Sequence, residues 1–286
     1  MDYRKKFVVE PGAKVKLGKI DPEFKDKHDE SHHTASSKIQ KHVERMAKAQ
    51  YLLYADASQS LLVVLQALDA GGKDGVVHHV FSAMNPQGTS VFSFKQPTKV
   101  ESAHDFLWRI HRHTPGKGEV VIFNRSHYED VLVVRVHKLV PKAVWSKRYE
   151  LINGFEKMLH DNGTRILKFY LHISPQEQLE RFSQRLDDPM RHWKISEADY
   201  SERKLWPDYI EAYEDAMERT STRHAPWYVI PSNHKWFRNL AISEILADTM
   251  DDMGLKLPPA QVDIAEIRRK YHTAAAQQAR RNQKAP

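Results

Sequence analysis

The sequence has no cysteine among its 286 residues, which excludes disulfides, thiolate metal sites and a cysteine nucleophile. It has no apolar run long enough to span a membrane, and its N-terminal segment lacks the long apolar region of a secretory signal. These absences predict a cytoplasmic protein with no membrane partner. The 41% of apolar residues suffices for a sizeable core, and the length allows one large α/β domain or two small ones.

Negative charge is also in deficit, because 44 Lys and Arg outnumber 37 Asp and Glu, giving a net charge of +7 and a pI of about 9.3. The basic balance suggests a polyanionic partner, namely nucleic acid, an anionic membrane or a phosphate polymer, while simple solubility is the alternative. No helix-turn-helix, zinc or single-strand stacking motif is present, so we expect no specific nucleic-acid partner, although the basic tail could bind one non-specifically. The N-K-x-D motif of a GTPase-like switch is missing as well.

What the sequence does contain is an apolar run beginning at Leu61 that breaks into a glycine-rich loop ending in Gly72-Lys73. We expect the following segment, 76–84, to be helical. Strand, glycine loop, lysine and helix form the context of a phosphate-binding loop, in which backbone N–H groups, a helix N-terminus and a lysine face phosphate oxygens. A strand-to-helix turn that carries Gly-Gly-Lys by chance is the alternative, and the flanking strand and helix favour the phosphate site.

The loop departs from the common G-x-x-x-x-G-K-[ST] pattern. Ala67 stands at the first glycine, and Asp74 stands where a Ser or Thr would contact magnesium. A further carboxylate, Asp69, lies inside the loop. An acid among phosphates is repulsive unless a cation lies between them, so Asp69 and Asp74 suggest Mg²⁺ held by carboxylates.

A second polar cluster follows the apolar segment 120–123 and reads Asn124-Arg125-Ser126-His127-Tyr128-Glu129-Asp130. Asn124 occupies the position where P-loop proteins place an acid near magnesium, but an amide offers no charge. Arg125 is placed to reach a transferring phosphoryl group. Glu129 and Asp130 begin the next segment. Ordinary solvent-exposed residues at a strand end are the alternative, which the neighbouring phosphate loop disfavours.

A third cluster is basic. Arg181 and Arg185 are four residues apart and share a helix face, and Arg191 and Lys194 follow beyond Pro189. Guanidinium groups match phosphate oxygens bidentately. A solvated basic face is the alternative, which stays open for Arg181 and Arg191, whereas for Arg185 we favour a functional role.

The wider pattern alternates strands and helices. Expected helices span 37–57, 101–113, 126–139, 141–162, 175–186, 197–220 and 234–253, and expected strands span 89–94, 119–123, 165–173 and 227–230. The alternation predicts an α/β fold, a three-layer P-loop kinase-like parallel sheet with a helical lid, and ligands at the carboxyl ends of the strands. Residues 1–36, including His28, His32 and His33, are expected to form an extended, solvated arm. Residues 37–257 would form the kinase domain with a lid at about 187–222, and residues 258–286 a basic tail.

The three clusters together resemble the motifs of the polyphosphate kinase 2 family. That family has a phosphate loop ending in G-K-D, a second loop of the form [DN]-R-S-x-Y, and an arginine-bearing lid with D-P-x-x-x-W-K. The resemblance runs from about Tyr51 to Asp252, and the motifs are specific in combination. It implies a P-loop kinase fold related to thymidylate kinases, Mg²⁺-dependent transfer between inorganic polyphosphate and nucleotides, and a homo-oligomer.

Carried over by matching position, the resemblance implies that Asp69 binds Mg²⁺ and orients the acceptor phosphate. Lys73, Arg125 and Arg185 would hold the transferring phosphates. The second loop looks most like the subgroup that phosphorylates both AMP and ADP, with Glu129 on the acceptor side, and many members have Asp at the position of Asn124. Further candidates for substrate binding are Ala70, Gly71, Gly72, Asp74, Gly75, Asn124, Glu129, Asp130, Arg181, Arg191 and Lys194. The alternative is an ATP-dependent nucleoside or nucleotide kinase of the same fold, distinguished by its phosphoryl donor.

Overall fold

A computed structural model describes residues 2–26 and 32–283 of the chain. The structure divides into two units, Met1–Leu255 and Lys256–Pro286, and the first unit contains the sheet and every site discussed below. The second unit holds seven Lys and Arg against two Asp and Glu, a net charge of +5, which leaves only +2 for the first unit. The basic balance of the chain therefore belongs mainly to its C-terminal segment, whose helix α13 (Ile264–Gln283) is exposed at each residue whose side chain is described.

A six-stranded sheet forms the centre of the first unit, in the order β1-β6-β5-β2-β4-β3. Its strands are β1 (Val8–Val9), β2 (Ser60–Gln66), β3 (Thr89–Ser93), β4 (Val120–Asn124), β5 (Thr164–His172) and β6 (Trp227–Pro231). All neighbouring strands are parallel except β1, which pairs antiparallel with β6. The predicted parallel α/β sheet is confirmed, while the short antiparallel edge strand was not expected.

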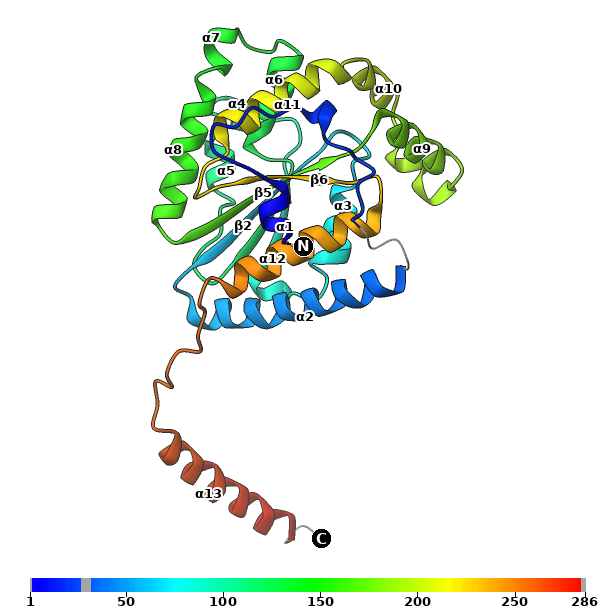
Figure 1. Ribbon diagram of the computed structural model, residues 1–286. Coiled ribbons are helices and arrows are strands. Elements are labelled where there is room, and N and C mark those ends of the chain that lie inside the picture. Colours follow the sequence, from blue (N-terminus) through cyan, green and yellow to red (C-terminus); the bar gives the residue numbers. More distant parts are fainter. Residues whose placement is uncertain (1, 27–31, 284–286) are drawn as a thin grey trace. The chain divides into compact units, whose positions relative to one another are not determined.

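Helices cover both faces of the sheet, so the unit has three layers (Figure 1). The α-helices are α1 (Tyr3–Phe7), α2 (His32–Asp56), α3 (Lys73–Val80), α4 (Lys99–Ser102), α5 (Trp108–His111), α6 (Val133–Val136), α7 (Lys142–Trp145), α8 (Arg148–Asp161), α9 (Pro175–Leu186), α10 (Glu197–Lys204), α11 (Trp206–Thr220) and α12 (Lys235–Asp251). Short 3-10 helices are η1 (Leu17–Lys19), η2 (Pro86–Gly88), η3 (His127–Asp130) and η4 (Pro189–Lys194). Figure 1 shows α2 and α12 on one face and α8 and α11 on the other.

The central strand β2 explains why the layers form. All seven of its residues are buried. Because successive side chains of a strand point to opposite faces, Leu61, Val63 and Leu65 pack with the α2 and α12 layer, while Leu62 and Val64 pack with the α8 and α11 layer. No helix in the described part of the chain is both long and apolar enough to cross a membrane.

The expectation of an extended N-terminal arm is wrong for the described residues. Tyr3 and Phe7 lie on one side of α1 and are buried against Phe237 of α12, with ring centroids 5.6 and 6.1 Å apart. Strand β1 then extends the sheet, and α2 begins at His32, within the expected arm. The apolar side chains of the segment 2–26 therefore pack it against the core, although many of its residues are charged. His28 and the side chains of His32 and His33 lie outside the described residues.

Three further expectations change in detail. The segment 187–222 is not uniformly lid-like, because η4 and α10 bury no residue whereas Ala212 and Tyr213 of α11 belong to the core. The expected helix 101–113 is interrupted between α4 and α5, where the Asp105 carboxylate accepts a hydrogen bond from the Leu107 N–H at 3.0 Å. The expected helix 126–139 begins as the 3-10 helix η3, with the Ser126 hydroxyl capping the Tyr128 N–H at 3.2 Å.

Candidate active site

The phosphate loop, residues 67–75, connects the end of β2 to the start of α3. Gly72 has a φ of +99°, a left-handed conformation that suits glycine, and a Cβ atom on Gly71 would lie 2.4 Å from the Cβ of Ala67. The loop therefore needs both glycines to turn this tightly. Lys73 begins α3, and its ammonium group reaches back to donate to the Ala67 carbonyl at 2.9 Å. Burial, reinforced by the nearby Arg125, lowers the pKa of Lys73.

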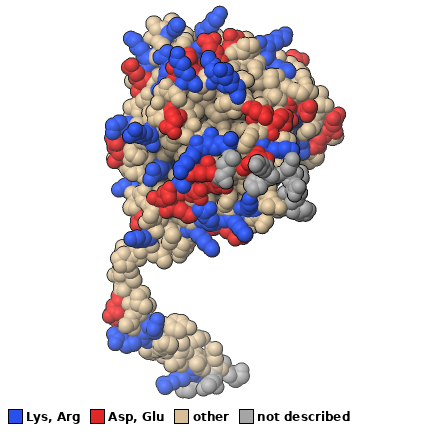
Figure 2. All heavy atoms as spheres, in the orientation of Figure 1, with Lys and Arg blue, Asp and Glu red and all other residues tan. Residues whose placement is uncertain are grey.

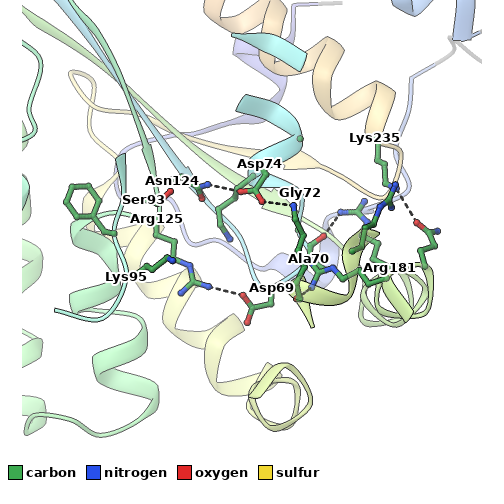
Figure 3. A pocket seen from close by; sticks show the side chains of 18 residues that line it. Asp69, Ala70, Gly72, Asp74, Ser93, Lys95, Asn124, Arg125, Arg181 and Lys235 are labelled. Carbon is green, nitrogen blue, oxygen red and sulfur yellow. Dashed lines mark hydrogen bonds and ion pairs between the residues drawn. The ribbon is translucent and has the colours of Figure 1, made fainter. Parts of the chain in front are cut away.

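A cavity of about 540 Å³, called the first cavity below, opens over this loop (Figure 3). Every candidate residue except Glu129 and Asp130 lines it. The structure therefore brings together side chains from β2–α3, the end of β4, α9 and η4 that are far apart in the sequence. Figure 2 shows Lys and Arg interspersed with Asp and Glu over one face of the first unit, whereas the first cavity is lined by more Lys and Arg than Asp and Glu.

Arg125 and Asp69 meet across this cavity. Arg125 follows β4 with a φ of +61°, and its N–H donates to the Leu65 carbonyl of β2 at 3.1 Å. Its guanidinium group then donates to the Asp69 carboxylate at 3.0 Å and lies 3.9 Å from the Glu129 carboxylate. The unusual backbone conformation thus turns Arg125 towards the phosphate loop.

A second cavity of about 470 Å³ adjoins the first, and both are lined by Asp69 and Arg125. Glu129 lies in this second cavity together with the aromatic residues Trp206, Tyr209 and Tyr213. Burial raises the pKa of Glu129, although the positive charges of Arg125 and Lys73 act in the opposite direction. The candidate residues therefore divide between two spaces that share an Asp–Arg pair.

Asp74 links the phosphate loop to the segment after α9. Its carboxylate accepts hydrogen bonds from the Asn124 amide at 2.9 Å and from the Lys194 ammonium at 3.2 Å. Burial alone would raise the pKa of Asp74, but these two hydrogen bonds hold it below its usual range. The Arg185 guanidinium donates to the Lys194 carbonyl at 3.2 Å, so the basic residues of α9 and η4 are tied to the loop through side chains.

Arg181 has a different role from its basic neighbours. Its guanidinium group donates to the carbonyls of Ala70 at 2.8 Å and of Ser232, and it forms an ion pair with Glu177 at 2.6 Å. The side chain is 6% exposed, which rules out the solvated basic face that the sequence left open. Arg181 lines the first cavity and supports the backbone of the phosphate loop.

Asp130 does not reach either cavity. Its carboxylate accepts a hydrogen bond from Arg148 at 2.9 Å and lies 4.0 Å from Arg109. Its place in the fold therefore does not support the expectation that it binds substrate. It ties the second loop to the start of α8.

A buried network anchors the same loop from inside the protein. The Lys168 ammonium of β5 donates to the Glu156 carboxylate at 2.6 Å, to the Tyr128 hydroxyl at 2.8 Å and to the Thr220 carbonyl at 2.7 Å. His127 lies 3.1 Å from Glu156. Burial would raise the pKa of Glu156, but the charge of Lys168 and the bond from His127 lower it. With all three ammonium donors used, the network fixes η3 just after Arg125.

Sequence inspection missed several residues that line the first cavity, namely Ser93, Phe94, Lys95, Gln184 and Lys235. Lys235 begins α12 just after β6, and its ammonium donates to Gln184 at 3.3 Å. Burial, with the charge of Arg181, lowers the pKa of Lys235. Polar residues that follow β3 and β6 meet at the same sheet edge as those that follow β2 and β4, so position after a predicted strand is the signal that could have found Lys95 and Lys235.

Asp69 and Asp74 are the two carboxylates that the sequence assigned to magnesium. Among the described residues, no group of three or more His, Cys, Asp or Glu side chains converges. Mg²⁺ in phosphoryl-transfer sites is commonly held by one or two carboxylates plus substrate phosphates, which requires no such group. Asp69 fits, because it lines both cavities and, within the described chain, only its Oδ1 accepts a hydrogen bond. Asp74 fits less well than the sequence suggested, since Asn124 and Lys194 engage both of its oxygens.

A parallel sheet whose central strand leads through a glycine loop and a lysine into a helix defines a P-loop protein of the kinase type. A family model described as polyphosphate kinase 2 (PPK2) matches residues 27–258. The chain belongs to the polyphosphate kinase 2 family, as its three motifs predicted.

Individual relatives agree with this assignment. The chain is 50% identical over 263 residues to the AMP/ADP-polyphosphate phosphotransferase of Meiothermus ruber, covering 92% of this chain and 98% of the relative. It is 45% identical over 270 residues to the ADP-polyphosphate phosphotransferase of Rhodopseudomonas palustris, covering 89% and 92%. The crystal structure of polyphosphate kinase 2 from Arthrobacter aurescens TC1 superimposes with a TM-score of 0.91 at 40% identity and covers 96% of this chain and 97% of that one.

Proposed function

We propose that this protein transfers the terminal phosphoryl group of inorganic polyphosphate to AMP, ADP or both, forming ADP and ATP. The observation that carries the proposal is the pair of cavities that meet at Asp69 and Arg125. One is lined by a phosphate loop and basic side chains, and the other by aromatic residues and a carboxylate. The names of the similar proteins from Meiothermus ruber and Rhodopseudomonas palustris support the same reaction.

The first cavity suits the donor. Polyphosphate has no base or sugar to recognise, so a protein must bind it through charge and shape. Lys73, Arg185, Arg191, Lys194 and Lys235 surround this cavity. The N–H groups at the start of α3 add partial positive charge directed at the loop.

The second cavity suits the acceptor nucleotide. Trp206, Tyr209 and Tyr213 offer aromatic surface for an adenine base, and Glu129 and His137 offer polar contacts. A nucleotide phosphate entering from this side meets Asp69 and Arg125, which also line the donor side. The acceptor and donor phosphates are thereby brought to one point, as in-line transfer requires.

Transfer then depends on positioning and on neutralising the charge of the moving phosphoryl group. As the bond from the phosphoryl group to the polymer oxygen breaks and the bond to the nucleotide oxygen forms, Lys73, Arg125 and Arg185 hold the phosphate oxygens. Asp69 would hold Mg²⁺, which when bound polarises the phosphates and screens them from the carboxylate. Reversibility, a homo-oligomeric state and a cytoplasmic location remain parts of this proposal.

The proposed role of Asp69 predicts that Asp69→Asn lowers turnover by at least ~100-fold, because a contact made in the transition state is lost. Initial rates measured across a range of Mg²⁺ concentrations test this, and the variant should require more Mg²⁺ than the wild type. If only the KM for polyphosphate changes, Asp69 belongs to donor binding instead.

The direct test is to incubate the protein with Mg²⁺, AMP and polyphosphate and to measure ADP and ATP. ATP as donor, with AMP or a nucleoside as acceptor, is the matched reaction for the ATP-dependent kinase. Product formed from polyphosphate supports the proposal, whereas product formed only from ATP would show that the protein is an ATP-dependent kinase. A salt series adds a second criterion, because the KM for a polyanion held by several cations should rise more steeply with ionic strength than the KM for AMP.

A further inference from the structure

Arg238 of α12 lies directly beneath the phosphate loop. Arg238 is 2% exposed and does not line the first cavity, so it contacts the loop from within the protein. A Cβ atom on Gly72 would lie 2.0 Å from its Nη1 atom, and one on Gly75 would lie 3.1 Å from its Nη2 atom. The guanidinium group therefore fills the space that glycine leaves at these two positions.

The guanidinium group of Arg238 is held by an amide oxygen. In the described part of the chain no carboxylate lies within ion-pair distance of it, and its Nε and Nη2 atoms both donate to the amide oxygen of Asn239, at 3.1 and 2.9 Å. Arg181, the other buried arginine at the loop, is paired with Glu177. Burial, with the charge of Arg181 nearby, lowers the pKa of Arg238 to about 9.

An unpaired buried cation destabilises a fold, and an apolar side chain of similar size would avoid this penalty. At this position, however, the charge lies on the inner side of a loop whose outer side faces the first cavity. In a poorly solvated environment, it acts on a bound phosphate with little screening. The cost to the fold and a benefit to phosphate binding therefore arise from the same feature.

We propose that Arg238 is a positioning residue that holds the Gly72–Gly75 turn of the phosphate loop and leaves its charge unneutralised until a phosphate chain binds. This inference rests on the proposed function only in taking the first cavity as the polyphosphate site. It predicts opposite effects on the two states of the protein. Removing the charge should stabilise, or leave unchanged, the free protein while weakening its response to polyphosphate.

Arg238→Met keeps most of the side-chain volume and removes the charge. We expect a thermal midpoint without ligand equal to or above that of the wild type, a smaller increase in that midpoint on adding polyphosphate, and a kcat/KM for polyphosphate at least ~10-fold lower. The KM for AMP should change by less than about twofold. Arg238→Lys keeps a charge but not the fork that spans the loop and Asn239, so its kcat/KM should lie between the two.

Asn239→Asp provides an isosteric test that leaves Arg238 in place. A carboxylate at this position would pair with the guanidinium group and neutralise the charge beneath the loop. If Arg238 acts through that charge, the free protein becomes more stable and the polyphosphate-induced increase in the thermal midpoint shrinks. If Arg238 serves only to fill space, Asn239→Asp keeps the full response to polyphosphate, which would overturn the proposal.

Arg148→Met is a matched control, because Arg148 is also largely buried but is paired with Asp130 and lines neither cavity. It should lower the thermal midpoint of the free protein and leave the polyphosphate-induced increase intact. The same pattern in Arg238→Met would make Arg238 an ordinary structural arginine. If Arg238→Met does not fold, the polyphosphate responses of Arg238→Lys and Asn239→Asp test the proposal instead.

Failure of this inference is distinguishable from failure of the proposed function. Wild-type protein that neither gains stability from polyphosphate nor transfers phosphoryl groups from it would refute the proposed donor. Wild-type protein that does both, with Arg238 and Asn239 variants behaving identically to it, would refute only the role of Arg238.

Discussion

The fold contains two groups of buried charges, and they are built differently. Around Lys168 and Glu156, each ammonium donor has an acceptor and the positive and negative charges match. Around the phosphate loop, Lys73, Arg181 and Arg238 have one ion-paired carboxylate among the described residues, that of Glu177. In the first group the two charges balance without a ligand, and in the second the charges do not balance.

The two groups show that buried charges can stabilise a fold or bind a ligand. The exposed fraction of the side chains does not by itself distinguish these roles. A balanced network can hold a loop in place, as the Lys168 group holds η3. Removing one of its charges should lower the stability of the fold. In an unbalanced group the cations repel one another until an anion binds. Removing one of these cations should therefore weaken substrate binding and turnover. Charge balance is therefore the property to test by mutation.

The largest effect is expected for Lys73→Ala. The ammonium group supplies charge to the transferring phosphates, so turnover should fall by at least ~100-fold. Its only hydrogen bond among the described residues is to the Ala67 carbonyl, so the thermal midpoint should change little. Turnover with polyphosphate and AMP, together with thermal unfolding, tests both expectations. Near-normal turnover in a folded variant would refute the phosphate-loop interpretation.

Lys168→Met should show the opposite pattern. It leaves the Glu156 carboxylate buried without its cation, which should lower the free energy of unfolding by about 3–5 kcal/mol. Urea unfolding measures this change. The double variant Lys168→Met with Glu156→Leu removes both charges and should recover at least half of the loss. Equal destabilisation in the single and double variants would mean that charge balance is not what holds this network.

Arg185→Lys asks whether the cationic group needs geometry as well as charge. An ammonium group cannot reproduce a bidentate fork on phosphate oxygens, so kcat/KM for polyphosphate should fall by roughly tenfold. Arg112→Lys, at an exposed arginine outside both cavities, is the control and should match the wild type. Wild-type kinetics for Arg185→Lys would reduce Arg185 to a general contributor of positive charge.

The smallest effect concerns Glu129 and pH. Because burial raises the pKa of Glu129 above its ordinary 4.5, the folded protein binds this proton more tightly than the unfolded chain does. The stability that the proton contributes is present below pH 4.5 and is lost as pH rises through the raised pKa. Glu129→Gln should therefore be more stable than the wild type at neutral pH and equal to it in acid.

Much of the fold was predictable because its signals are local. The helix α9, Pro175–Leu186, was predicted to the residue, since Ser174 caps the Glu177 N–H at 3.1 Å and Pro175 occupies the first turn. The apolar run 61–65 and the alternation of strands and helices likewise predicted a parallel sheet covered on both faces. Parallel strands end at one edge, which is why the clusters at Asp69 and Arg125 could be expected to meet.

By itself, the sequence determined the α/β class, the phosphate loop and the three clusters, because each follows from spacing within a short segment. Only the tertiary structure decided that Arg181 supports the loop, that Asp130 faces Arg148, that α1 packs against α12 while β1 joins the sheet, and that Arg238 lies beneath Gly72. These depend on side chains from distant segments sharing a confined space, where burial and charge balance, rather than residue type, fix what a group does.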